Sequence, residues 1–498
     1  MVRLRRGVRL SPLPERLPDE VVRPLLDAVE GLAIGGDGLH VGDAVIPRAR
    51  LVQGRHLAAG SRYRVELPER EGGDGGVVEI TVGSWDRARR IRLDGTFELD
   101  GHAATSSLEA DLTGRRIRTV RVAGGYRATK GRLRSLRRAS WEGEATLGAR
   151  GEMPELSARV RHRFGVVTAG VEGDGGRRRW KGRVVARGSG RGVLRPFAAV
   201  GLLVARRRLR SGFAEAVDDF ATRWNETVPG LAERDLHAPA VPLRHEVAVR
   251  GVSREWADAF VAGLRAAVER LEFKRGRLVR DGGTSDDVRL LAGKHLASGA
   301  RYRLATVHEN PVEATVTAWD TGRARVEFRT DDGRATGWFE LRDGKLRVEW
   351  RSGPAGDWAE LADVTGELDA DLHGWASGAP VVRTVTHAFG TETLSLSCAP
   401  GEAGWTVAFT ETQEPRDWLH PLYTVATAFI PLGDTFAESV EAAGERWDGA
   451  LDEAADDPAG AAARLVDAVL LHGLLEDFPL LRAAREHDEK VPLGGMDP

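Results

Sequence analysis

The chain contains a single cysteine, Cys398, among its 498 residues. An intramolecular disulfide is therefore impossible, and a structural zinc site built on several thiolates is excluded. The longest nearly uncharged apolar stretch, residues 196–205, is about half as long as the roughly 20 residues that a membrane-spanning helix needs. We therefore expect a protein that does not cross a membrane. Because no secretory signal is visible at the N-terminus, we expect it in the cytoplasm.

Motifs that mark common enzyme chemistry are missing as well. The patterns GxSxG, HExxH, CxxC and GxGxxG do not occur, and no Walker lysine is followed by Ser or Thr. The 13 histidines include no HxH or HxxxH pair that could start a local metal site. The sequence therefore assigns no catalytic residue, metal ligand or cofactor, and it favours a protein that is not an enzyme.

The most informative feature is an internal duplication. The segment GRHLAAGSRYR at residues 54–64 returns as GKHLASGARYR at residues 293–303, with eight of eleven positions identical. Later landmarks repeat in the same order, and the offset is 225 both for His162 and His387 and for Trp180 and Trp405. These later landmarks are Trp85 and Trp319, His162 and His387, Trp180 and Trp405, and Trp224 and Trp447. A repeat of this length predicts two copies of one fold.

Each copy begins with a short alternating strand and a helix, and Ser253 is a good N-cap for the second of these helices. A long run of period-two alternation follows, broken by Gly and Asp turns, and predicts eight to ten antiparallel strands per copy. Each copy closes with an amphipathic helix. The apolar stripes of these two helices run through Phe213, Val217, Phe220 and Trp224, and through Phe436, Val440 and Trp447.

The sequence thus predicts an α+β protein: two tandem copies of a curved antiparallel sheet, each packed on a long C-terminal helix, with a helical appendix. We expect the first copy at residues 1–228, a linker containing three prolines at 229–242, and the second copy at 243–452. The appendix and tail occupy residues 453–498, where Asp457-Pro458 is a typical helix start.

Charge separates the two copies. Residues 1–240 carry 44 Lys and Arg against 30 Asp and Glu, whereas residues 241–498 carry 28 against 44. Three interpretations stay open: the two halves dock on each other, the basic half binds an anionic partner, or the surface charges have drifted. Four arginines that follow an apolar run are absent from the second copy, and we take them as a candidate anion-binding group. They are Arg206, Arg207, Arg208 and Arg210.

A histidine and a tyrosine recur together in the repeated segment, as His56 with Tyr63 and as His295 with Tyr302. Such a pair can move protons in an active site. The alternative is structural: the glycines and the tyrosine fix a turn, and the histidine bonds to the backbone. Both interpretations remain open at this stage.

The order of strand, helix, antiparallel run and closing helix resembles the helix-grip fold of the Bet v 1, polyketide-cyclase and START-like superfamily. The starts at Pro14-Glu15 and Ser253-Arg254-Glu255, and the phrases at residues 299–303 and 319–328, look like that family's opening and its third and fourth strands. The resemblance implies an apolar ligand held between sheet and helix. The implied lining is Trp85, Trp180, Phe213, Phe220, Trp319, Trp405 and Phe436, with His56 and His295.

Two functions follow as hypotheses. The first is a non-enzymatic protein that binds a hydrophobic lipid- or polyketide-like molecule between sheet and helix. The second is an interaction or scaffold protein with filled cores, whose basic half docks an acidic partner, a membrane surface or nucleic acid. An aromatase- or cyclase-like enzyme is a third hypothesis, and it requires His56 or His295 to face a cavity.

Overall fold

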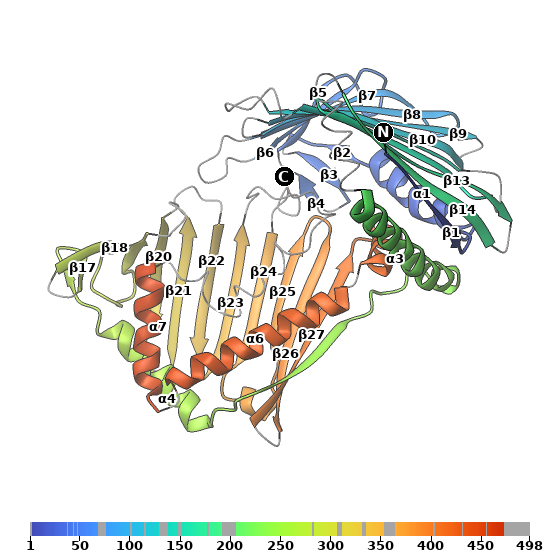
Figure 1. Cartoon of the computed structure of the whole chain (residues 1–498). Helices are drawn as coiled ribbons and strands as arrows, with labels where there is room; N and C mark the ends of the chain where they lie inside the picture. Colours follow the sequence, from blue (N-terminus) through green and yellow to red (C-terminus); the bar gives the residue numbers. More distant parts are fainter. Residues whose placement is uncertain are drawn as a thin grey trace. The chain divides into compact units, whose positions relative to one another are not determined.

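The structure, a computed structural model, describes residues 2–472 except 37, 43, 47, 68–75, 100–101, 114–115, 129–137, 148–151, 177–178, 192–205, 281–282, 306–310, 331–334, 353–363, 402–403, 431 and 455. The chain divides into two compact units. Unit 1 comprises Met1–Ala238 and Asp417–Ile430, and unit 2 comprises Pro239–Arg416 and Pro431–Pro498. Both units consist of one large antiparallel sheet with helices on it (Figure 1).

Unit 1 is built on an 11-stranded sheet with the order β1-β14-β13-β12-β11-β10-β9-β8-β7-β6-β5. The first strand of the chain thus pairs with the last strand of the copy, and all pairs are antiparallel. The strands are β1 (Val2–Leu10), β5 (Ala49–Gln53), β6 (Arg62–Leu67), β7 (Gly76–Asp86), β8 (Arg90–Leu99), β9 (His102–Thr113), β10 (Arg116–Ala128), β11 (Arg138–Thr146), β12 (Glu155–His162), β13 (Gly165–Gly176) and β14 (Arg179–Gly190). A separate three-stranded sheet contains β2 (Ala33–Ile34), β3 (Leu39–Val41) and β4 (Ala44–Ile46).

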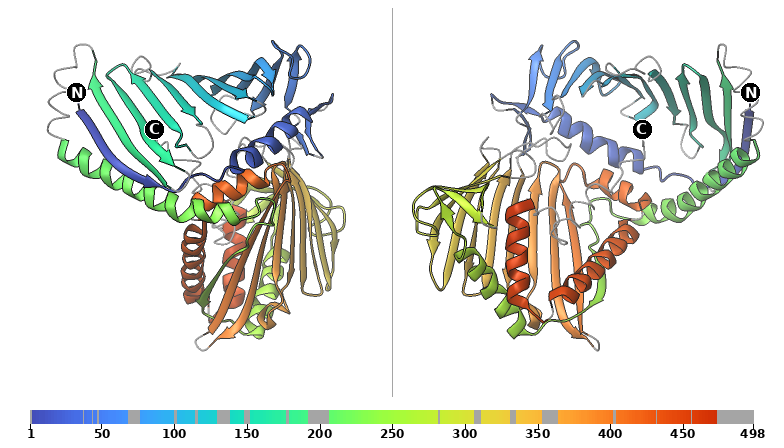
Figure 2. Two further views of the ribbon diagram at one scale, coloured as in Figure 1. Left: turned by 90° about the vertical axis from the view of Figure 1, so that its right-hand side faces the viewer. Right: turned by 60° about the vertical axis from the view of Figure 1, so that its left-hand side comes forward.

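The long helix α3 (Arg206–Glu233) packs on the β1 and β14 side of this sheet (Figure 2). Part of its predicted stripe is buried: Val217 packs against Val8, Leu10 and Trp180. Phe220, which the sequence places in the same stripe, is 50% exposed. The helix continues to Glu233, so the first residues of the expected linker are helical.

Helix α5 (His420–Phe429) belongs to unit 1, although it lies in the second copy of the repeat. Together with α1 (Leu17–Glu30) and the end of α3 it buries Leu17, Leu231 and Leu236. The hydroxyl of Thr424 donates to the carbonyl oxygen of Leu236 at 3.2 Å. The division by contacts therefore differs here from the expected boundaries, which place residues 417–430 with the second copy.

Unit 2 is built on a 13-stranded antiparallel sheet with the order β15-β27-β26-β25-β24-β23-β22-β21-β20-β19-β18-β17-β16. Its strands are β15 (Leu243–Val249), β16 (Phe273–Lys274), β17 (Arg277–Arg280), β18 (Gly283–Ala292), β19 (Arg301–Leu304), β20 (Val312–Trp319), β21 (Arg323–Thr330), β22 (Ala335–Arg342), β23 (Lys345–Ser352), β24 (Val364–Asp371), β25 (Val381–His387), β26 (Gly390–Gly401) and β27 (Gly404–Pro415). Both large sheets contain more strands than the eight to ten that the sequence predicts.

Three helices and a 3-10 turn pack on the sheet of unit 2. Helix α6 (Leu432–Ala454) lies diagonally across the sheet and contacts β15 (Figure 1). Helix α4 (Arg254–Glu269) begins at the predicted cap, where the Ser253 hydroxyl accepts from the backbone N–H of Trp256. Helix α7 (Pro458–His472) starts as predicted and packs on α4, and the turn η3 (Trp375–Ser377) contacts β26. The part of the appendix after residue 472 lies outside the described residues.

The predicted fold class is confirmed. Each unit has a long C-terminal helix against an open antiparallel sheet, and a helical appendix follows the second copy. In the part of the chain that the structure describes, no helix is both long and apolar enough to cross a membrane.

A candidate ligand site on the inner face of unit 1

The inner face of unit 1 is the side of the 11-stranded sheet that carries Val8, Trp180 and Val184, against which α3 packs. Residues that pair across neighbouring strands share a face, so the register identifies the rest of this face. Val184 pairs with Val171, which pairs with Leu156, and Leu156 pairs with Ala145. Nearly every residue on this face is apolar or glycine. Charged side chains alternate onto the opposite, outer face.

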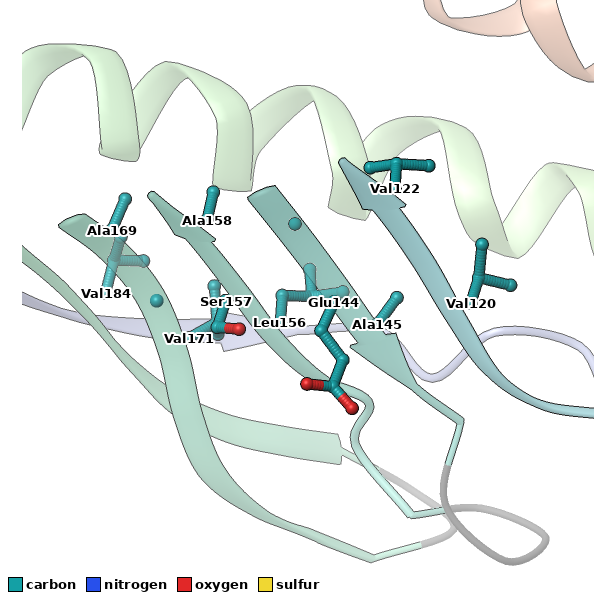
Figure 3. A pocket seen from close by; sticks show the side chains of 12 residues that line it. Val120, Val122, Glu144, Ala145, Leu156, Ser157, Ala158, Ala169, Val171 and Val184 are labelled. Carbon is teal, nitrogen blue, oxygen red and sulfur yellow. The ribbon is translucent and has the colours of Figure 1, made fainter. Parts of the chain in front are cut away.

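A hollow of about 320 Å³ lies on the inner face over strands β10 to β14. In Figure 3 the side chains of Val120, Val122, Ala158 and Ala169 point to one side of the strands, and Glu144 points to the other. The lining residues are Val120, Val122, Gly143, Glu144, Ala145, Leu156, Ser157, Ala158, Ala169, Gly170, Val171 and Val184. The wall is thus made of small and branched apolar side chains.

The second copy shows why the hollow exists. At the offset of 225 that relates Trp180 to Trp405, larger residues replace those of the first copy. Among the lining residues, the replacements are Gly143 by Leu368, Ala169 by Leu394 and Val184 by Phe409. The strand pairing agrees with this alignment, because Gly143 pairs with Ala158 and Leu368 with Arg383, which are also 225 apart.

The two units also differ in how many large hydrophobic side chains are exposed to solvent. On the inner face of unit 1, Val122, Leu156, Val160 and Val167 are exposed, and Val167 reaches 55%. Among the residues of unit 2 that the structure describes, only Val241 and Leu291 are exposed large hydrophobic side chains. Contiguous exposed apolar surface of this kind is typical of binding sites.

None of the four aromatic residues that the resemblance implies as ligand lining in unit 1 is among the residues that line the hollow. Trp180 is buried in the core under α3, and Phe213 packs against the same core. Phe220 is 50% exposed and contacts the ring of Trp224. The indole N–H of Trp85 donates to Glu30 at 2.8 Å, near α1 and away from the lining of the hollow.

Their counterparts in unit 2 belong to its core. Trp405 and Phe436 are buried in one cluster, to which Trp375 and Trp447 add their rings. The indole N–H of Trp319 donates to Glu269 at 3.0 Å. Whether any of these residues binds a ligand stays a prediction.

The contacts of His56 and His295 are those of the structural alternative, in which each histidine bonds to the tyrosine and to the backbone. In His56, Nδ1 lies 2.7 Å from the hydroxyl of Tyr63, and Nε2 lies 3.0 Å from the carbonyl oxygen of Val29. His295 repeats both contacts, with Tyr302 and the carbonyl of Val268. Because protein groups occupy both ring nitrogens, neither histidine has a free nitrogen for a ligand in this arrangement.

A third histidine–tyrosine pair carries no sequence motif. The hydroxyl of Tyr126 lies 2.6 Å from Nδ1 of His102, and the two rings stack at 5.6 Å between centroids. Both side chains are partly buried and lie on the inner face. The two residues are 24 apart in the sequence, and only the pairing of β9 with β10 brings them together.

Basic residues of unit 1 fall into two groups. Many are paired across the outer face, as Arg121 is with Glu109 and Glu144. A strip on the outer face of β1 and β14 has no ion pair among the residues described; it contains Arg3, Arg5, Arg9, Lys181, Arg183 and Arg187. There the pKa of Arg3 is lowered first by partial burial and then by the charges of its neighbours Arg5 and Arg187.

The predicted anion-binding arginines open helix α3, where Arg207, Arg208 and Arg210 are exposed. The side chain of Arg206 and the apolar run at 194–205 lie outside the described residues. No cluster of three or more potential metal-ligating side chains occurs in the described parts of the chain.

Comparison with known proteins gives no match to a family model and none to a curated protein. Solved structures that match include the di-domain ARO/CYC protein BexL of the BE-7585A biosynthetic pathway, at 12% identity, 93% of this chain, 98% of that chain and a TM-score of 0.14. The di-domain ARO/CYC protein StfQ of the steffimycin pathway matches at 12% identity, with 94% of this chain and 97% of that chain covered and a TM-score of 0.14. DynU16, from the dynemicin biosynthetic locus, matches at 12% identity, with 87% of this chain and 98% of that chain covered and a TM-score of 0.12.

The predicted resemblance to tandem helix-grip proteins agrees with these matches and with the sheet and long helix of each unit. Two of these proteins are aromatase/cyclases, which are enzymes, and this finding points against the expectation of a protein that is not an enzyme. We therefore do not maintain that prediction. TM-scores this low assign no residue of this chain to a site, so the candidate site rests on its own geometry.

Proposed function

We propose that unit 1 binds a hydrophobic small molecule on its inner face, in the hollow over β10 to β14. The observation that carries this proposal is the replacement of Leu368 and Leu394 by Gly143 and Ala169 at the corresponding positions of the first copy. One fold is thus present twice, and small residues line the hollow in the first copy where the second has leucines.

The size and lining of the hollow support this function. Sites for small molecules have volumes of about 300–1,000 Å³ and mostly apolar walls, and the hollow of about 320 Å³ lies at the lower end of that range. Moving an apolar ligand from water onto such a wall gains roughly 25 cal/mol per Å² of apolar surface buried. Exposed Val122 and Leu156 would lose contact with water in the complex.

The experiment transfers the second copy's residues to the first. In the double variant Gly143→Leu, Ala169→Leu the hollow is filled, because both residues line it. We expect wild type to bind the uncharged fluorophore N-phenyl-1-naphthylamine saturably at one site per chain, and the double variant to lose that binding. Equal binding by both proteins would contradict the proposal.

A matched control is Thr168→Leu. Thr168 precedes Ala169 in β13, so its side chain lies on the outer face. This variant adds the same leucine to the same strand without filling the hollow. It should bind the fluorophore as wild type does.

A second candidate function is the binding of an anionic partner, favoured by the basic strip on the outer face of β1 and β14. Arg3 pairs in register with Arg187, and Arg9 with Lys181, which holds like charges side by side. The triple variant Arg3→Glu, Arg5→Glu, Arg187→Glu should abolish salt-dependent retention on heparin. Unchanged retention would exclude this strip, and the arginines at the start of α3 would be tested next.

A further inference from the structure

The pair His102 and Tyr126 lies at one end of the inner face, on the same strands as the proposed ligand site. Tyr126 shares its face with Val120 and Val122, because their positions along β10 differ by even numbers. At about 3.4 Å per residue, the backbone of Tyr126 is roughly 14 Å from that of Val122. A fused-ring molecule in the hollow can extend over that length.

The surface beside the pair is aromatic. Between the pair and the hollow, Gly124 leaves room that the indole of Trp141 occupies, since a Cβ at Gly124 would lie 2.4 Å from that ring. An apolar ligand would thus lie against aromatic surface on its way to the pair.

The hydrogen bonding of His102 differs from that of His56. Only Nδ1 of His102 has a partner among the described residues, the hydroxyl of Tyr126. Both nitrogens of His56 are occupied, by Tyr63 and Val29. His102 therefore keeps Nε2 for a further hydrogen bond, whereas His56 does not.

The pair also belongs to the first copy alone. Tyr126 pairs with Ala139, and Ala139 pairs with His162. In the second copy the residue that pairs with Val364, at the position of Ala139, is Ser352. The tyrosine is therefore present in the copy that has the hollow and absent from the copy that lacks it.

We propose that His102 and Tyr126 form the polar recognition point for a phenolic or enolic hydroxyl on the hydrophobic ligand, a role that rests on the proposed function of the inner face. A hydroxyl group both donates and accepts a hydrogen bond. If Tyr126 donates to Nδ1, the pair offers the Nε2–H as donor and the tyrosine oxygen as acceptor. If Nδ1–H donates to Tyr126, it offers the tyrosine O–H as donor and Nε2 as acceptor. In either tautomer of His102 the pair therefore offers one donor and one acceptor, and a ligand hydroxyl can bond to either of them.

The test compares pyrene with 1-hydroxypyrene, which differ by one hydroxyl, in titrations followed by pyrene fluorescence. Wild type should bind 1-hydroxypyrene about 3- to 10-fold more tightly, the net contribution of one good hydrogen bond. Tyr126→Phe and His102→Ala should each bring that ratio close to one. A ratio that stays at the wild-type value in both variants would overturn the inference.

The control is Tyr302→Phe, which removes a tyrosine hydroxyl from the histidine–tyrosine pair of unit 2, His295 with Tyr302. It should keep the wild-type ratio. Equal binding of both compounds by wild type would overturn the hydroxyl recognition alone. Binding of neither compound would overturn the proposed function and this inference with it.

Discussion

The contact of helix α6 with strand β15 makes a quantitative prediction at Gly444. Gly444 is buried in the middle of α6, and a Cβ placed there would lie 2.6 Å from Cγ2 of Val247 and 3.4 Å from Cγ1 of Val249. Alanine is favoured over glycine inside a helix by about 1 kcal/mol. Overpacking a well-packed core costs about 1–3 kcal/mol. Both valines are buried and cannot easily move away, so we expect Gly444→Ala to reduce the free energy of unfolding by about 1 kcal/mol.

The same helix supplies the opposite case. Gly449 is exposed, and a Cβ there would meet nothing within 4 Å. Gly449→Ala therefore keeps the gain in helix propensity without the overlap, and should raise the free energy of unfolding by up to about 1 kcal/mol. The two variants make the same chemical change in one helix and should differ in sign.

The assay is urea unfolding followed by hydrogen–deuterium exchange of peptides from α6 and β15, which reports on unit 2 alone. The midpoint should fall for Gly444→Ala and rise for Gly449→Ala. If both variants stabilise unit 2 equally, α6 does not approach β15 as closely as the structure shows, and the reasoning is refuted.

Three further predictions follow from other contacts. Tyr302→Phe removes the hydroxyl that bonds to Nδ1 of His295. It should lower the stability of unit 2 by about 1–3 kcal/mol in thermal unfolding, because Nδ1 of the partly buried histidine loses its hydrogen bond. An unchanged Tm would argue against a structural role of this pair. Leu236→Ala should cost unit 1 about 2–4 kcal/mol, since Leu236 is 1% exposed and packs beneath α5; a negligible loss would mean that α5 does not complete this core. Burial raises the pKa of Glu340, but the hydrogen bond and charge of Arg323, joined by Arg325, hold it below its ordinary value. The stabilisation by this pair is therefore complete above the ordinary pKa of about 4.3 and is lost as the pH falls through the lower folded-state pKa; Glu340→Gln should reduce the acid sensitivity of unit 2, and an identical stability profile between pH 3 and 5 would contradict this.

Local patterns predicted the elements well where one physical signal dominates. Three kinds of feature depend on neighbours close in sequence: the cap at Ser253, the helix start at Asp457-Pro458, and the apolar stripes of α3 at Val217 and of α6 at Phe436. The number of strands was underestimated, because short edge strands such as β16 have no periodicity to read.

Features that depend on distant pairing were not visible in the sequence. Helix α5 looks like part of the second copy, and only its contacts with Leu17 and Leu236 place it in unit 1. His102 and Tyr126 carry no motif and have no doubled counterpart, so nothing marked them before the register of β9 and β10 was known. The duplication itself could have indicated the hollow, because aligning Gly143 with Leu368 shows that the first copy lacks a leucine side chain at this position.

The central claim is that the inner face of unit 1 holds a hydrophobic small molecule. The most direct test is mass spectrometry of solvent extracts from wild type and from the variant Gly143→Leu, Ala169→Leu, both purified in parallel from the organism that encodes the chain. The account predicts one hydrophobic molecule per chain in the wild-type extract and its loss from the variant. A wild-type extract without such a molecule, or the same molecule at equal amount in both, would contradict the claim.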